Sequence, residues 1–79
     1  MDKTELLDKI YQTIESVVKH DNFEKAEVLS ANDVDGWDSL SHMLIISSIE
    51  EQFAVKFKMR ELSKMNNVGD LADIIITKK

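Results

Sequence analysis

The side chains that most often carry enzymatic chemistry are few in this sequence and poorly placed for it. His20 and His42 fall in different predicted helices, and neither belongs to a His-Glu-x-x-His pair, so we expect no metal site. The two glycines are too far apart along the chain to form a phosphate-binding loop. Asp38, Ser39 and His42 could be written as a catalytic set, but Ser39 and His42 would lie one turn apart on one helix, with no oxyanion hole. We therefore expect no catalytic residue and no enzymatic activity.

Ser39 stands in a setting that suits another kind of chemistry. It follows Gly36, Trp37 and Asp38, and Asp38 is a short polar residue of the type that caps helix N-termini. Ser39 is therefore expected to be exposed in the first helical turn. Unpaired backbone N–H groups and the helix dipole favour an anion there, by about 0.3–1 kcal/mol for an exposed phosphate. The position suits a serine that carries a phosphodiester, although Asp-Ser-Leu alone indicates only a capped helix start.

Hydrophobic periodicity predicts an α-helix before this serine and a loop between the two. The first helix is predicted over Thr4–His20, with Asp2 or Thr4 as its N-cap and apolar residues at helical spacing. Residues 21–37 contain several Asn and Asp residues and a glycine, which predict a long ordered loop. A loop of this length is unusual unless it is functional.

Three more helices are predicted after the loop. The second begins after its N-cap Asp38 and ends at Phe53, and residues 53–57 are interpreted as a connection because a lone strand would have no partner. A short third helix is predicted over Met59–Met65. The last is capped by Asn66 or Asn67, and its inner stripe is expected to contain Val68, Leu71, Ala72, Ile75 and Ile76. The predicted fold is an all-α, four-helix bundle with a short third helix and a long first loop.

Length and composition indicate one small domain over residues 1–79. A chain of 79 residues that is 43% hydrophobic has room for a single core. It contains no cysteine, which suits a cytoplasmic protein, and no apolar run approaches the roughly 20 residues of a membrane span. The net charge of −5 argues against nonspecific binding to nucleic acids or anionic membranes. We expect a cytoplasmic monomer with transient partner contacts.

Several motifs in their order along the chain closely resemble the acyl carrier proteins, the small acidic carriers of fatty-acid, polyketide and related synthesis. The resemblance covers nearly the whole chain. It includes the amphipathic first helix, the loop ending Asp35-Gly36-Trp37, Asp38-Ser39-Leu40, the helix closing Ile49-Glu50-Glu51-Gln52-Phe53, and Asn67-Val68-Gly69-Asp70-Leu71 before the last helix. It implies a carrier of acyl thioesters rather than an enzyme.

The resemblance also implies a cofactor and partners. Ser39 would receive a 4′-phosphopantetheine arm from coenzyme A, transferred by a separate phosphopantetheinyl transferase that uses magnesium. Acyl-loading and acyl-processing enzymes would then meet the thioester at the end of the arm. Tethering agrees with this role, because it keeps an intermediate at high effective concentration, and the cysteine-free chain offers no rival thiol.

Helical spacing divides the second helix into a core side and an adjoining side. The core side is expected to contain Ile45, Ile46, Ile49 and Phe53. The adjoining side contains Ser39, Leu40, Met43, Leu44 and Ser47 and has more apolar surface than the core needs. We predict that Leu40, Met43 and Leu44 form a docking strip for partners beside the arm.

Two side chains near Ser39 are predicted to have structural roles. His42 falls near the core side of the second helix, and we expect a partly buried, hydrogen-bonded histidine rather than a pH sensor or a partner contact. Trp37 is expected to pack the loop against the bundle, with its indole N–H near the surface.

The charge pattern departs from the usual fatty-acid carrier, whose second helix and following segment are rich in acidic residues that dock on basic patches. Residues 38–52 keep Asp38, Glu50 and Glu51, of which Glu50 and Glu51 are candidate docking residues, but residues 53–64 have a net charge of about +3. We therefore predict a specialised carrier of a dedicated pathway. An aminoacyl or peptidyl carrier remains an alternative, as does a non-carrier helical adaptor that binds a partner helix.

Overall fold

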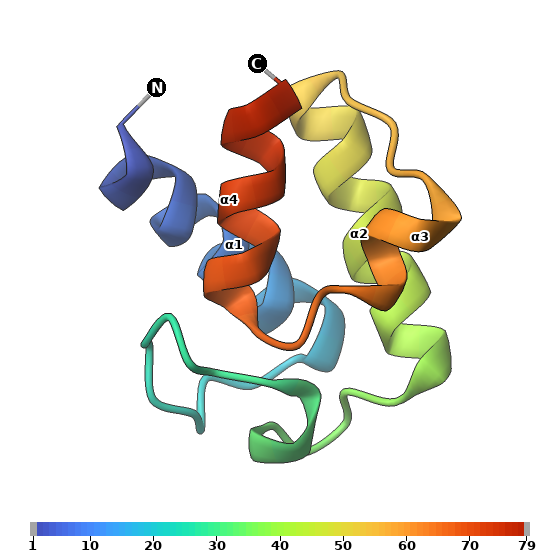
Figure 1. The fold of residues 1–79 in the computed structure, drawn as a ribbon. Coiled ribbons are helices and arrows are strands. Elements are labelled where there is room, and N and C mark those ends of the chain that lie inside the picture. Colours follow the sequence, from blue (N-terminus) through green and yellow to red (C-terminus); the bar gives the residue numbers. More distant parts are fainter. Residues whose placement is uncertain (1, 79) are drawn as a thin grey trace.

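Helices account for all the regular structure in residues 2–78, which are the residues that this computed structural model describes (Figure 1). No strand occurs within that range, which confirms the all-α prediction. The elements in chain order are α1 (Lys3–Val18), the 3₁₀ helix η1 (Ala31–Asp33), α2 (Ser39–Phe53), α3 (Met59–Ser63) and α4 (Val68–Lys78).

The three long helices α1, α2 and α4 begin after short polar residues, as predicted. The Asp2 side chain accepts a hydrogen bond from the Thr4 amide at 3.1 Å, so Asp2 rather than Thr4 caps α1. The side chain of Asn67, not that of Asn66, accepts from the Asp70 amide at 2.8 Å at the start of α4. The predicted first and third helices extended too far at their C-terminal ends, in each case by one turn or less. α1 ends at Val18 because Lys19 adopts a left-handed conformation with φ of 66°, and α3 ends at Ser63.

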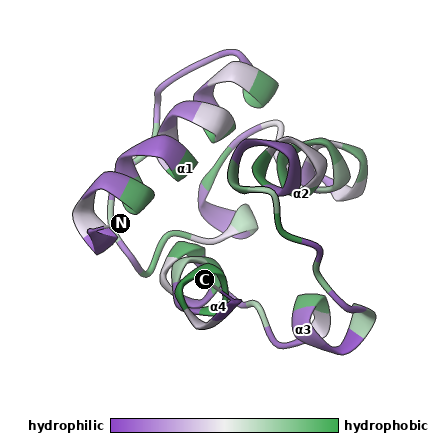
Figure 2. Ribbon diagram, turned by 90° about the horizontal axis from the view of Figure 1, so that it is seen from above, coloured by the Kyte–Doolittle hydropathy of each residue, from purple (hydrophilic) through white to green (hydrophobic). Residues whose placement is uncertain are grey.

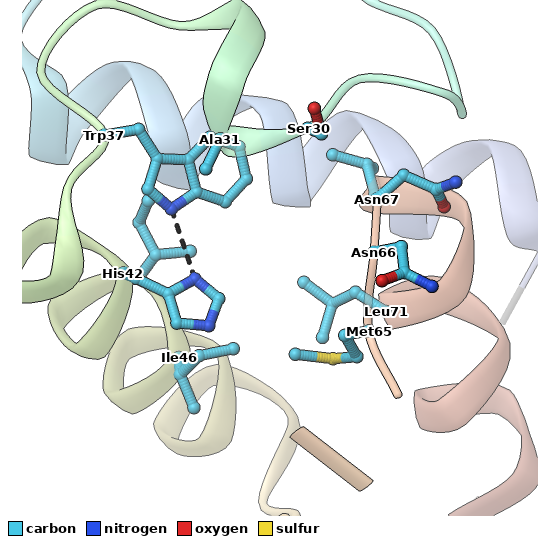
Figure 3. Close-up of a pocket in the computed structure, with 11 residues that line it drawn as sticks. Ser30, Ala31, Trp37, His42, Ile46, Met65, Asn66, Asn67 and Leu71 are labelled. Atoms are coloured by element: carbon cyan, nitrogen blue, oxygen red, sulfur yellow. Dashed lines mark hydrogen bonds between the residues drawn. The ribbon is translucent and has the colours of Figure 1, made fainter. Parts of the chain in front are cut away.

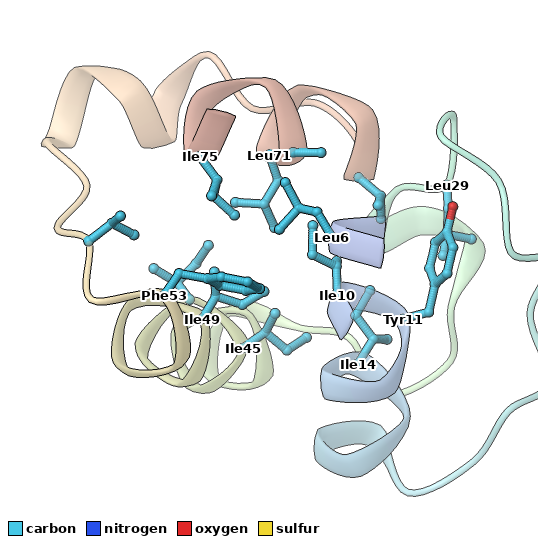
Figure 4. Packing of buried hydrophobic residues seen from close by; sticks show 14 of the residues in the cluster. Leu6, Ile10, Tyr11, Ile14, Leu29, Ile45, Ile49, Phe53, Leu71 and Ile75 are labelled. Carbon is cyan, nitrogen blue, oxygen red and sulfur yellow. The ribbon is translucent and has the colours of Figure 1, made fainter. Parts of the chain in front are cut away.

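One apolar core joins α1, α2 and α4 (Figure 4). All four predicted core residues of α2 are buried. The prediction that Ile76 belongs to the inner stripe of α4 is wrong, because its side chain is 43% exposed. The other predicted members of the stripe, Val68, Leu71, Ala72 and Ile75, are buried. Ile76 lies one residue beyond Ile75, and this rotates it away from the helices that cover α4. Figure 2 shows the view along the bundle, with α3 outside the three long helices.

The long loop between α1 and α2 is tied to the start of α4. The Val68 amide donates to the Leu29 carbonyl at 2.9 Å, and the Gly69 amide donates to the Glu27 carbonyl at 2.8 Å. These two amides have no partner within α4, so the loop satisfies them. The loop therefore closes the end of the bundle where α2 begins (Figure 1). None of the described helices has the length and apolar character needed to cross a membrane.

The contact between Gly69 and the loop leads to the first prediction. A Cβ atom at Gly69 would lie 3.1 Å from both the Cβ and the carbonyl oxygen of Glu27. Alanine normally favours a helix over glycine by about 1 kcal/mol, but here the overlap should reverse that preference. We expect Gly69→Ala to lower the free energy of unfolding by about 1–3 kcal/mol, measured by urea denaturation followed by circular dichroism. Gln12→Ala, at an exposed position of α1, is the control. Equal stability of Gly69→Ala and the wild type would contradict the proposed close contact.

Candidate functional site

Ser39 is the first residue of α2, and its side chain is exposed. Asp38 precedes it in an extended conformation, and the Asp38 carboxylate accepts a hydrogen bond from the Ser41 amide at 2.9 Å. That backbone hydrogen bond holds the pKa of Asp38 below its usual range. A capped helix start therefore presents Ser39 to solvent, as the sequence predicted.

The chain that leads into Ser39 is fixed at several points. Gly36 has a φ of 87°, in the left-handed region that favours glycine, and its carbonyl accepts a hydrogen bond from the Ser41 hydroxyl at 2.6 Å. His20 Nε2 donates to the Asp35 carbonyl at 2.6 Å, while its Nδ1 accepts from the Asn22 amide at 3.0 Å. His20 thus links the end of α1 to the turn before Ser39.

His20 and Ser41 were missed as positioning residues by the sequence analysis. Their partners lie 15 and 5 residues away along the chain and are backbone carbonyl groups. A backbone carbonyl leaves no trace in the residue type, so no pattern in the sequence could have indicated these bonds.

Trp37 and His42 form a pair beside Ser39. The Trp37 indole N–H donates to His42 Nδ1 at 3.2 Å, and the two rings are stacked with centroids 6.1 Å apart (Figure 3). His42 is half-buried and hydrogen-bonded, as predicted, and burial lowers the pKa of its imidazole. Trp37 packs against the core, as predicted, but its N–H is directed to His42 in a partly buried contact instead of reaching the surface.

The Trp37–His42 bond also limits what His42 can do for Ser39. An indole N–H is only a donor, so Nδ1 of His42 is the acceptor and holds no proton. This nitrogen is already occupied and cannot take a proton from the Ser39 hydroxyl. Within residues 2–78, no group of three or more metal-ligating side chains occurs. Ser39 is therefore an exposed hydroxyl for which His42 Nδ1 is not available as a base.

The predicted docking strip lies on the surface. Leu40, Met43 and Leu44 are 72%, 54% and 54% exposed, so these apolar side chains belong to neither the core nor its edge. Leu40 directly follows Ser39, and the other two lie about one turn further along α2.

The two acidic residues predicted to take part in docking, at the end of α2, differ in their surroundings. Glu50 is half-buried, and its carboxylate accepts a hydrogen bond from the Phe57 amide at 2.9 Å, so it supports the chain reversal that follows α2. Glu51 is exposed. Glu50 therefore has a structural contact that the sequence analysis did not foresee, whereas the side chain of Glu51 is exposed to solvent.

Comparisons with known proteins agree with this geometry. The family described as "Phosphopantetheine attachment site" matches residues 26–75, a range that contains the later part of the loop, all of α2 and α3 and most of α4. No curated protein matches the sequence. Among solved structures, the chain is similar to the holo acyl carrier protein from Geobacter metallireducens, determined by solution NMR. The two are 44% identical, the TM-score is 0.82, and the match covers 91% of this chain and 83% of the other.

The family match includes more than half of the chain, and the solved structure shares its fold at high identity. These findings confirm the resemblance to acyl carrier proteins, the four-helix fold and the covalent 4′-phosphopantetheine cofactor that the resemblance implied. The chain belongs to the acyl carrier protein family, whose members carry a phosphopantetheine attachment site.

Proposed function

We propose that Ser39 is the residue that carries the 4′-phosphopantetheine arm, and that the protein presents acyl groups as thioesters on it. The observation that carries this proposal is the exposed hydroxyl of Ser39 at the capped start of α2, inside the region that matches the attachment-site family. In the transfer, the Ser39 oxygen forms a bond to the phosphorus of the phosphopantetheine moiety of coenzyme A. The pyrophosphate bond breaks, adenosine 3′,5′-bisphosphate leaves, and the serine proton is released.

Two features of the chain suit this role. The first-turn backbone N–H groups of α2 and its positive dipole end lie next to Ser39 and favour the phosphodiester. The chain has no cysteine, so the arm would supply the single thiol and acyl groups could be loaded at only one place. Tethering keeps the thioester at high effective concentration for successive enzymes. The predicted cytoplasmic location and monomeric state stay predictions.

Replacement of the serine tests the attachment point. After incubation with coenzyme A, magnesium and a broad-specificity phosphopantetheinyl transferase, we expect intact-mass spectrometry to show one arm-sized gain in the wild type and none in Ser39→Ala. Ser47→Ala is the matched control, because Ser47 is also exposed on α2, and it should gain the arm. A gain of mass in Ser39→Ala would place the arm elsewhere.

We further propose that Leu40, Met43 and Leu44 form the surface on which the transferase and acyl-processing enzymes dock. Glu51 and the solvent-exposed part of the Glu50 side chain would lie at the end of this surface that is farther from Ser39. The three apolar side chains are exposed next to Ser39, so a partner that reaches the arm can cover them in the same contact. Covering a leucine or methionine side chain contributes about 1.5–3 kcal/mol when burial is complete.

Charge insertion tests this surface. We expect Leu40→Glu or Met43→Glu to lower kcat/KM for the transferase about tenfold or more, because a charge is buried in place of an apolar side chain. Val28→Glu is the control, since Val28 is 76% exposed on the loop between α1 and α2. Circular dichroism checks that the helix content is unchanged. Unfolding of Leu40→Glu, or an equal loss of activity in Val28→Glu, would contradict the assignment.

We also propose that the protein serves a dedicated pathway with its own partners. Four cationic side chains, Lys56, Lys58, Arg60 and Lys64, are exposed in or next to α3, and no carboxylate within residues 2–78 lies within 4.0 Å of their charged nitrogens. Glu61, the one acidic residue of this segment, is paired with Lys78 at 2.9 Å. In contrast, Lys3 is paired with Glu27 and Asp73, and Lys25 is paired with Glu15. A basic segment around α3 disfavours partners with basic docking surfaces.

Charge reversal tests the choice of pathway. With a housekeeping fatty-acid ketosynthase that docks acidic carriers, we expect the wild-type acyl form to react poorly and Lys56→Glu/Arg60→Glu to react about tenfold faster, with the difference shrinking in high salt. Lys9→Glu/Lys19→Glu changes the net charge by the same amount on α1 and at its C-cap, and it should have little effect. Wild-type activity equal to that of the cell's main carrier would contradict a dedicated role.

A further inference from the structure

The surface around α3 combines one exposed apolar side chain with several cations. Met59, the first residue of α3, is 84% exposed. The cations next to it along the chain are Lys58, Arg60 and Lys64, all of them exposed, and Lys56 lies at their edge. We call these five residues the α3 face. It differs from the docking strip of α2, whose three members are all apolar.

The extended segment before α3 directs its cations away from the core. Val55 is buried and Phe57 is packed against the core. Successive side chains of an extended chain point to opposite sides, so Lys56 and Lys58 fall on the outer side, and both are exposed.

The helix α3 continues this outer side. Leu62 is packed against the core, whereas Arg60 and Lys64 are exposed and lie four residues apart, a spacing that places them on the same side of a helix. In Figure 2, none of the three long helices covers the outer side of α3. The α3 face is therefore open to a partner.

Polar contacts hold this segment in place. The Glu61 carboxylate accepts a hydrogen bond from the Lys58 amide at 2.7 Å and pairs with Lys78 at 2.9 Å, which links α3 to the last turn of α4. The Phe57 amide is held by Glu50 at 2.9 Å. A surface that is already ordered loses less conformational freedom when a partner binds. Because Glu61 is paired, its charge is offset by Lys78 rather than by the cations of the α3 face.

The charge of the whole chain limits which partner can bind there. Residues 53–64 have a net charge of about +3, whereas the chain as a whole has a net charge of −5. An acidic surface is attracted to the α3 face and repelled by the remainder of the chain, which restricts its orientation. Lys56 shares a groove with Glu50 and Glu51, so the positive charge is centred on α3 itself.

The exposed methionine distinguishes a protein partner from a membrane. Interfacial helices bind anionic membranes through a whole apolar face, but α3 has five residues and exposes one large apolar side chain, Met59. A single apolar centre within a polar rim is instead typical of protein interfaces, in which methionine and arginine are enriched.

We propose that the α3 face binds an acidic surface of a dedicated partner protein, with Met59 in an apolar pocket of that surface and Lys58, Arg60 and Lys64 paired with carboxylates around it. This inference rests on the proposed dedicated role and adds the chemistry of the partner. The cations that disfavour a basic docking surface are then the ones that recognise the acidic surface.

Titration of the apo protein with three short peptides, followed by amide chemical shifts, tests the α3 face. The first peptide has glutamates around two central leucines, the second has glycines in place of the leucines, and the third has lysines in place of the glutamates. We expect the first peptide to shift the amides of residues 56–64 and to bind about fivefold more tightly than the second, because its leucines cover Met59. The third should not shift these amides. Added salt should weaken binding of the first two.

Replacement of the methionine tests the apolar centre. Met59→Ser should lower the affinity for the first peptide about fivefold and leave the affinity for the second unchanged. Val28→Ser is the matched control, because Val28 is 76% exposed on the loop between α1 and α2, and it should bind like the wild type. Circular dichroism checks that both variants are folded.

Removal of cations tests the rim. Arg60→Gln/Lys64→Gln should lower the affinity for both acidic peptides about fivefold, because two ion pairs are lost. Lys9→Gln/Lys19→Gln removes the same charge from α1 and its C-cap, and it should bind both peptides like the wild type.

Four outcomes would overturn the α3 face as an acidic-partner site. The first two are equal affinity for the peptides with and without leucines, and a loss in Val28→Ser equal to that in Met59→Ser. The third is binding to vesicles of phosphatidylcholine and phosphatidylglycerol that Arg60→Gln/Lys64→Gln abolishes, which would make the face a membrane surface. The fourth is self-association of the apo protein that the same variant abolishes, which would make a second copy the partner.

Failure of this inference is distinguishable from failure of the proposed function. The titrations contain no arm, transferase or ketosynthase, so a negative result leaves the attachment at Ser39 and the ketosynthase comparison unchanged. Conversely, wild-type activity with the housekeeping ketosynthase equal to that of the cell's main carrier overturns the dedicated role, whereas selective binding of the first peptide would still identify the α3 face as a binding surface.

Discussion

The anchoring of the long loop to α4 is the constraint on which the position of Ser39 depends. The first two amides of α4 have no acceptor in their own helix, and they donate to the carbonyls of Leu29 and Glu27. Leu29 and Val34 enter the core beside this contact, so the loop is held by both polar and apolar interactions. A loop of this length would otherwise leave α2 free to shift. With the loop held, α1, α2 and α4 meet at one end of the bundle, where α2 begins.

Trp37 and His42 connect this scaffold to the proposed chemistry. They lie between the exposed hydroxyl of Ser39 and the buried core, and each satisfies the other's polar group at the edge of the interior. The pair therefore keeps this edge of the interior apolar and ordered without leaving the indole N–H unpaired.

The net charge of −5 hides an uneven distribution that bears on partner choice. Internal ion pairs use Lys3 and Lys25 to neutralise part of the acidic first half, while four cations around α3 stay exposed. Surface ion pairs add little stability, so the main effect of this arrangement is on the potential that an approaching partner meets. The exposed apolar strip of α2 and the basic segment around α3 give a surface unlike that of a uniformly acidic protein.

The sequence by itself determined the helices, the capped start at Asp38, the exposed Ser39 and the buried side of α2, because these follow from local periodicity and short-range hydrogen bonds. The family resemblance also rested on motifs that are contiguous in the chain. Only the tertiary structure decided that Ile76 faces solvent, that Glu50 binds the Phe57 amide and that the Trp37 N–H meets His42. Each of these depends on where a separate segment of backbone or side chain is placed in space, and residue type and spacing do not encode that placement locally.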